Sequence, residues 1–177
     1  MPTFPFDLSL AGNSQIISSA SVESVGSALA ASFAPGGTTN WVAANRALYV
    51  PFRIAQRRIA YKMLTYNGSA TNGNFDVGVY DAKGTRLVSG GGAAQTGTSQ
   101  IQEYDITDTQ LFPGLYYMGV VCDGTGRLLK WLLGAAEGQM LGLAQQASAY
   151  PLPATATFAS VAGTQVPWVA VVFRSTV

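Results

Sequence analysis

The sequence predicts an all-β protein that forms a two-sheet sandwich or a barrel. Phe75, Val77 and Val79 alternate with polar or small residues, which is the period of a strand with one buried face. Residues 81–84 then supply turn chemistry before a return strand begins at Thr85. Short apolar runs and tight turns recur along the rest of the chain, as they do in sandwiches and barrels. The turn signals include Asn67-Gly68, Asn72-Gly73 and Asp123-Gly124.

Nine strands are predicted after residue 41, each from an apolar or β-branched run between turn residues. They cover residues 47–54, 58–66, 74–80, 85–89, 101–106, 114–122, 127–133, 155–160 and 166–173. Pro51 interrupts the first run. Because proline cannot donate to a strand ladder, we expect this strand to lie at a sheet edge or to contain a bulge. Residues 137–143 fit one helical turn.

Residues 1–40 are predicted to form an extended N-terminal arm, and residues 41–177 form the sandwich domain. The arm holds only two charged side chains, Asp7 and Glu23, and is rich in Ser, Ala and Gly. Unlike an ordinary disordered tail it carries many apolar side chains, so we expect it to lie on a partner. Residues 21–33 fit a short helix, and the apolar pairs before them equally fit added β-strands. The predicted assembly contacts are Phe4, Phe6, Leu8, Leu10, Ile16, Ile17 and Phe33.

The composition predicts that much of the surface contacts other protein. Hydrophobic residues make up 48% of the 177 residues and the mean hydropathy is +0.22, which is enough for a sizeable core. Only 11% of residues are charged, against about 25% in an ordinary globular domain. A lone copy would expose little solvated charge, and we therefore expect oligomers.

The charge and hydropathy patterns indicate no export signal, no membrane partner and no nucleic-acid partner. The first residues lack a basic region and a continuous apolar core, and no stretch approaches the roughly 18 apolar residues of a membrane span. The formal net charge is +1. One local basic run holds Arg53, Arg57, Arg58 and Lys62, which we expect to be solvated charges that keep an edge strand from pairing.

The residues that most enzymes use for proton transfer are scarce. Histidine is absent, which excludes Ser-His-Asp and Cys-His catalysis and histidine metal sites. The single Cys122 lies in an apolar run and is predicted to be a small core residue. The carboxylates are densest at Glu103, Asp105 and Asp108, where we expect the two aspartates to end a turn, with a weak metal site as the alternative. We predict no enzyme, no cofactor and no metal.

Two loops, residues 66–74 and 90–100, are the candidate ligand-binding segments. The second is rich in glycine, but it lacks a lysine and precedes no helix pattern, so a flexible connection is favoured over a phosphate-binding loop. The candidate ligand contacts in these loops are Tyr66, Asn67, Asn72 and Gln95. Tyrosines could also stack on sugars, although packing in the core or at interfaces is favoured for Tyr61, Tyr66, Tyr80, Tyr104, Tyr116, Tyr117 and Tyr150.

Five stretches together resemble the small β-sandwich structural proteins of tailed bacteriophage particles. They are residues 41–53 (WVAANRALYVPFR), 73–81 (GNFDVGVYD), 105–109 (DITDT), 113–117 (PGLYY) and 166–170 (VPWVA). The similarity is one of pattern over residues 41–177 and leaves the arm outside. It implies a jelly-roll-like domain without catalysis, often a homotrimer, found in the virion and made in the host cytoplasm without a signal peptide.

With this resemblance and the apolar arm of residues 1–40, the leading hypothesis is a capsid decoration or cement protein whose arm pairs with neighbouring subunits. Its partners would be copies of itself and other virion proteins such as the major capsid protein. The alternative is a tail or fibre receptor-binding module whose loops meet a host glycan. A carbohydrate-active enzyme is least favoured, because no convincing acid and base pair accompanies Glu103 and Asp105.

Overall fold

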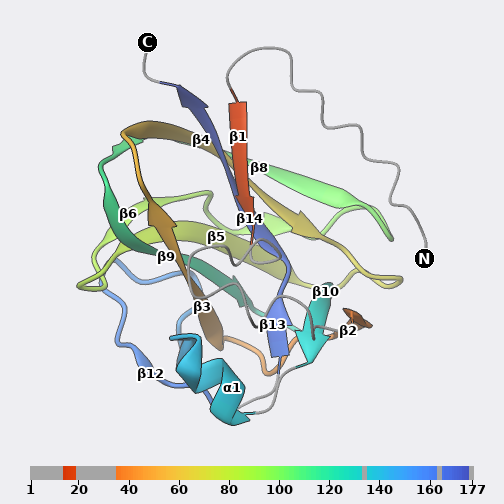
Figure 1. Ribbon diagram of the computed structural model, residues 1–177. Coiled ribbons are helices and arrows are strands. Elements are labelled where there is room, and N and C mark those ends of the chain that lie inside the picture. Colours follow the sequence, from red (N-terminus) through yellow and green to blue (C-terminus); the bar gives the residue numbers. More distant parts are fainter. Residues whose placement is uncertain (1–13, 19–34, 133–134, 163–164, 176–177) are drawn as a thin grey trace.

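A computed structural model of the chain describes residues 14–18, 35–132, 135–162 and 165–175. Almost all of its regular elements are strands (Figure 1). The strands are β1 (Ser14–Ser18), β2 (Pro35–Asn40), β3 (Ala47–Ile54), β4 (Arg58–Tyr66), β5 (Asn74–Asp81), β6 (Arg86–Ser89), β7 (Ala93–Ala94), β8 (Ile101–Leu111), β9 (Gly114–Cys122), β10 (Arg127–Leu132), β11 (Ala144–Gln146), β12 (Ala159–Ser160), β13 (Gln165–Pro167) and β14 (Val169–Ser175), and α1 is Ala135–Met140.

Eight of these strands form a jelly roll. The first sheet has the order β1-β14-β4-β8, and the centre of the second has the order β3-β9-β5-β6. The antiparallel pairs are nested along the chain: β1 with β14, β3 with β9, β4 with β8, and β5 with β6. One long hairpin rolled into two sheets gives this nesting, which confirms the all-β, two-sheet, jelly-roll-like prediction.

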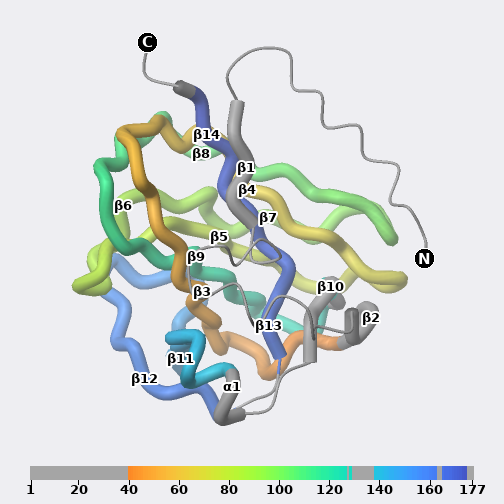
Figure 2. The backbone as a smooth tube through the Cα atoms, in the orientation of Figure 1, coloured from red at the N-terminus to blue at the C-terminus, as the bar shows by residue number. Residues whose placement is uncertain are grey.

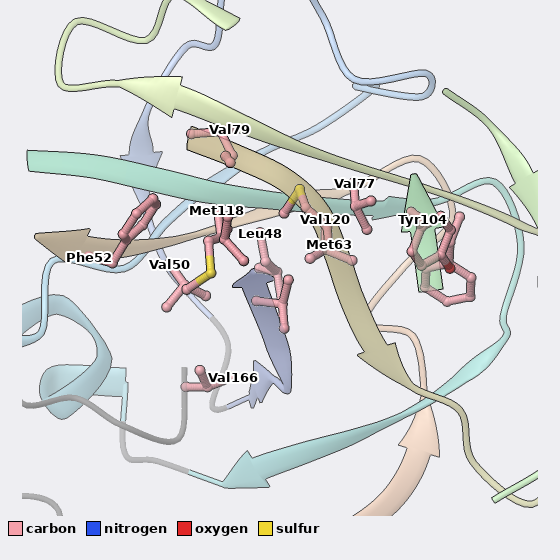
Figure 3. Close-up of a cluster of buried hydrophobic side chains, with 14 of the residues drawn as sticks. Leu48, Val50, Phe52, Met63, Val77, Val79, Tyr104, Met118, Val120 and Val166 are labelled. Carbon is pink, nitrogen blue, oxygen red and sulfur yellow. The ribbon is translucent and has the colours of Figure 1, made fainter. Parts of the chain in front are cut away.

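The core lies between the two sheets and follows the alternation of the strands. Phe75, Val77 and Val79 of β5 face inward with no exposed surface, as the alternating sequence predicts. Val171 of β14 meets them from the opposite sheet, and Figure 3 shows side chains of both sheets in this cluster. Cys122 is also fully buried here, so its prediction as a core residue is confirmed.

Further strands extend both sheets. β11 and β12 continue the second sheet beyond β3, and Figure 2 shows them beside α1 at the lower end of the view. The small sheet β13-β10-β2 continues the first, because β13 leads into β14 and Asn67 bridges to Leu128 of β10. The described parts of residues 1–40 are thus two strands, β1 on β14 and β2 on β10.

Several expected boundaries differ from the structure. The strand expected at 101–106 continues to Leu111, the strand at 155–160 shrinks to β12, and 166–173 divides at Trp168. β3 is an interior strand, but β11 pairs with it only as far as Tyr49, so Pro51 lies where β9 is the remaining partner. The predicted sheet edge is therefore present only in the part of β3 around Pro51, and not along the whole strand. The helical turn expected at 137–143 is α1, shifted towards the N-terminus.

Two members of the basic run, Arg58 and Lys62, do not lie on an edge strand, which corrects the sequence prediction for them, whereas Arg53 lies on the part of β3 that pairs only with β9. β4, which carries Arg58 and Lys62, lies between β14 and β8. Lys62 is opposite Asp105 in the register, and its ammonium bonds Glu103 at 2.5 Å and lies 3.7 Å from Asp105. These charges therefore stabilise a cross-strand pairing within the sheet.

The segment 147–158, here called the strap, crosses the outer face of the second sheet. Its Leu152 is 1% exposed and packs with Tyr49 and Tyr80. The Tyr80 hydroxyl donates to Pro153 O at 2.7 Å. Burial raises the pKa of Tyr49 to about 12 and also raises that of Tyr80, so both hydroxyls stay protonated at neutral pH.

Asp76 is the polar anchor of the strap. It lies on the outer face of β5 and is 1% exposed. One carboxylate oxygen accepts Leu152 N at 2.9 Å and the other accepts the Ser89 hydroxyl at 2.7 Å. Two residues further along β5, Gly78 leaves room for the strap, since an added Cβ would lie 2.7 Å from Val88 O and 3.2 Å from Leu152 Cδ1. The strap is therefore fixed by specific bonds as well as by apolar contact.

Candidate functional site

The connections at one end of the jelly roll are longer than those at the other. Residues 67–73, 90–100 and 123–126 meet at one end, as the pairs Tyr66 with Ile101 and Phe75 with Cys122 show. The connections at the opposite end are tight turns, at residues 55–57, 82–85 and 112–113. Because loops on a rigid scaffold are the usual place for binding residues, the long-loop end is the candidate functional site.

A buried amide network holds two of these loops together. Asn67 Nδ2 donates to Thr96 O at 2.6 Å and to Gln102 Oε1 at 2.9 Å, and Asn67 Oδ1 accepts Gln95 Nε2 at 2.9 Å. Gln102 Nε2 donates in turn to Ala94 O at 2.9 Å. Asn67 has no exposed surface, and Gln95 and Gln102 are 7% and 9% exposed. The amides are therefore bonded inside the protein.

The structure places Asn67 and Gln95, two of the predicted ligand contacts, inside the protein and not on the loop surface. Both are close together, but their amides are buried and bonded to each other and to loop carbonyls. The same bonds correct the expectation that residues 90–100 are a flexible connection, because this segment contains β7 and is fixed to β5 and to Asn67. The network positions the loops and leaves other residues to face outward.

Tyr66 and Asn72 are the predicted ligand residues that reach the surface. Tyr66 is half-buried and donates its hydroxyl to Ser99 O at 2.8 Å. Asn72 is exposed, and its side chain donates to the Thr125 hydroxyl at 3.3 Å. The exposed rim around them is polar and uncharged, with hydroxyls and amides that suit a neutral hydrogen-bonding ligand. It consists of Ser69, Thr71, Asn72, Thr96, Thr98, Ser99, Gln100 and Thr125.

Asp123 fixes the turn beside this rim. Its carboxylate accepts Asn74 N at 2.7 Å and Asn74 Nδ2 at 2.6 Å, and these bonds hold the pKa of Asp123 below its ordinary value of 3.8. Gly73 precedes Asn74 with a φ of +82°, and a Cβ there would lie 2.6 Å from the Asp123 carboxylate. Glycine is therefore required both for the turn and for the close approach.

We expect Asp123→Asn to flatten the acid dependence of stability. The folded pKa lies below 3.8, so Asp123 contributes stability above the unfolded pKa that is lost as the pH falls through the folded value. The difference in unfolding free energy between the two proteins should therefore narrow as the pH falls below about 4. Urea titrations at a series of pH values measure it, with Asp105→Asn, at a carboxylate that is 93% exposed, as the matched control. A difference that widens at low pH would contradict this.

The carboxylates of β8 do not end a turn, which corrects the sequence prediction. Asp105 and Asp108 lie within the strand, and the turn comes at residues 112–113. Glu103 and Asp105 pair with Lys62, which raises the pKa of Lys62, and Asp108 pairs with Arg174. In the part of the chain that the structure describes, no three His, Cys, Asp or Glu side chains group closely enough to hold a metal ion.

The tyrosines mainly pack. Tyr80 and Tyr104 are at most 4% exposed, and burial raises the pKa of Tyr104 to about 12. Tyr117 of β9 and Tyr150 of the strap pack against the cluster of Tyr49, Tyr80 and Leu152, and the ring centroids of Tyr117 and Phe158 are 4.4 Å apart. Tyr61 lies on the far side of the first sheet, under Arg174. The tyrosines are thus distributed over separate clusters, and the packing interpretation is confirmed for Tyr80 and Tyr104.

The predicted assembly contacts are divided between described and undescribed parts of the chain. Ile16 and Ile17 lie in β1 and pair with Val172 and Val171 of the same chain. Phe4, Phe6, Leu8, Leu10 and Phe33, together with the helix considered for residues 21–33, lie outside the described residues.

Comparison with known proteins adds no identification. The chain matches no family model, no curated protein and no solved structure. Among the described residues, no helix is both long enough and apolar enough to cross a membrane.

Proposed function

We propose that this chain is a non-catalytic structural protein of a bacteriophage particle, a capsid decoration or cement protein that binds through the segment before β1. The observation that carries the proposal is the position of β1. Among the described strands it is the last of the first sheet, so the largely apolar residues 1–13 join the domain at that edge. An apolar segment that leaves from an edge strand is well placed to lie on a neighbouring protein.

The use of the polar side chains supports a structural role. Asp76 holds the strap, and Asp123 holds a turn. The β8 carboxylates Glu103, Asp105 and Asp108 pair with cations of β4 and β14 in the same sheet. Asn67 and Gln95 hold the loops. Each of these groups is accounted for by the stability of the fold, and the low charge of the chain suits a surface that contacts other protein.

The proposal predicts that deletion of residues 1–13 abolishes particle binding without unfolding the domain. The deletion removes Phe4, Phe6, Leu8 and Leu10 and keeps β1. Burial of each such side chain contributes about 1.5–3 kcal/mol, so the affinity should fall by at least about a hundredfold. Co-sedimentation with particles that lack the protein measures binding, and thermal unfolding checks the fold.

The matched control keeps the chain length and the apolar residues. Thr3→Ser with Ser9→Ala changes only small polar groups of the same segment and should bind like the full chain. Full-affinity binding by the deleted protein would overturn the proposed attachment.

A second function, glycan binding by a tail or fibre protein, is supported by the uncharged rim around Asn72 and Thr125. Their side chains are exposed, bond each other, and belong to a surface of hydroxyls and amides. Neutral sugars are recognised by such groups together with an aromatic face. Host attachment that survives deletion of residues 1–13 and is lost in the double variant Asn72→Ala, Thr125→Ala would favour this role.

A further inference from the structure

The strand β1 is held in the jelly roll by a single neighbour. Five residues pair antiparallel with β14, from Ser14 opposite Arg174 to Ser18 opposite Ala170. β1 ends the order of its sheet, so within the described residues its other edge pairs with no strand. Among the jelly-roll strands that the structure describes, β1, β6 and β8 each pair with a single strand, so β1 belongs to the less supported strands of the fold.

The strand that pairs with β1, β14, is itself well supported by the rest of the fold. β14 is paired with β4 on its other side, and its residues Val171 and Phe173 are fully buried in the main core. Without β1, residues 170–174 would present a row of unpaired backbone groups directly beside that core. An edge of this kind binds an added strand through main-chain hydrogen bonds.

The chain between β1 and β2 is long enough to reach another copy. Residues 19–34 are sixteen in number, and sixteen residues span at most about 53–58 Å when extended. A compact domain of this length is about 40 Å across, from its expected radius of gyration. From Leu8 to Val22 the sequence carries no charged side chain, so no charge repulsion opposes the approach of two such segments.

We propose that β1 is exchanged between copies, so that Ser14–Ser18 of one chain pair with β14 of a second copy. The exchanged and unexchanged forms make the same β1–β14 contacts, so the exchange has a low energetic cost. Within one chain the effective concentration of β1 is of the order of millimolar, and close packing of copies on a particle provides a comparable one. This inference rests on the proposed assembly role and gives it a partner: a second copy of this chain.

The test uses cysteines on two different chains. Ser14→Cys is placed in one chain and Arg174→Cys in another, because opposite residues of antiparallel strands lie about 4.5–5.5 Å apart, within disulfide range. The two proteins are co-expressed with different tags, oxidised mildly, and examined on non-reducing gels before and after particle binding. Peptide mass spectrometry identifies the linked residues. Cys122, which is buried in the described structure, is left in place.

Exchange predicts a covalent species of twice the 18.5 kDa chain mass that links position 14 to position 174. The matched control pairs Arg174→Cys with Thr98→Cys, an exposed position on the long loops, and should give at least tenfold less of this species. The pair Ser18→Cys and Ala170→Cys, at the other end of the register, repeats the test should the first pair disturb folding.

The opposite result is equally defined. If a single chain carrying both Ser14→Cys and Arg174→Cys forms its disulfide at monomer mass, and the mixed chains form no linked species free or on particles, the exchange is overturned. Co-sedimentation of the same samples reports on the proposed function separately. Particle binding without the link removes only the exchange, and the link without particle binding removes only the particle role.

Discussion

Replacing Asp76 with alanine is expected to lower the free energy of unfolding by about 3–5 kcal/mol. Leu152 N and the Ser89 hydroxyl both bond this carboxylate, and hydrogen bonds to a charged group contribute about 1.5–3 kcal/mol each. Because Asp76 is 1% exposed, water cannot readily replace the lost acceptor. Urea unfolding followed by tryptophan fluorescence measures the loss.

Asp76→Asn is the matched control. Its amide oxygen can still accept Leu152 N, and its NH₂ group can donate to the Ser89 hydroxyl, which also accepts Gly91 N at 3.0 Å. We expect this variant to lose less than about 1.5 kcal/mol. An equal loss in both variants would show that the charge of Asp76, and not its hydrogen bonds, holds the strap. Proteolysis within residues 147–158 should be faster in Asp76→Ala alone.

The strands of the two sheets could be predicted because their inward faces repeat with period two. β3, β4 and β9 begin and end at the predicted residues, and β5 extends one residue further, because turn residues bound each of these apolar runs. Burial itself does not alternate, since β3, β5 and β9 contain runs of four to six buried residues where the strap covers the outer face of their sheet. The strap could not be predicted in the same way. Residues 147–158 carry no period, and they are placed by bonds to distant residues, among them Asp76 and Tyr80.

The extent of β8 illustrates how tertiary contacts override a turn signal. Asp105 and Asp108 are typical turn residues, yet they lie in the strand. Lys62 on the adjacent strand β4 and Arg174 on β14, one strand further along the sheet, supply the opposite charges, and Thr107 and Thr109 are β-branched. Local sequence cannot show which strands will lie in the same sheet as β8, so a prediction from local signals places the turn at Asp105 and Asp108, before the strand ends.

The sequence predicts the two loops of the candidate site, but it does not show which of their polar residues are buried. Asn67 and Gln95 are polar loop residues, which look exposed in sequence. The signal that was missed is Gln102, which shares the inward face of β8 with Tyr104 and Ile106. A polar residue at an inward position requires a partner, and that partner is the amide of Asn67.

We expect Asn67→Asp to destabilise the protein by about 3–5 kcal/mol at pH 7, because a buried carboxylate would face three acceptors. In the unchanged protein Asn67 Nδ2 donates to Thr96 O, Gly97 O and Gln102 Oε1. These three oxygens carry no hydrogen, so they cannot donate a hydrogen bond to the carboxylate that replaces the amide. Burial and these acceptors would raise the pKa of the new carboxyl, so stability is lost as the pH rises from its unfolded value of about 4. The deficit should therefore be smallest below pH 4, which urea titrations at several pH values measure.

Asn72→Asp is the matched control for this last change, since it makes the same substitution before a glycine in the same loop. Asn72 is exposed, so the new charge remains hydrated and the loss should stay below about 1 kcal/mol. Comparable losses at the two positions would contradict the buried network. If Asn67 instead served a ligand, its substitution would abolish binding and leave the unfolding free energy unchanged. The two variants thus distinguish an amide that stabilises the loops from one that binds a ligand.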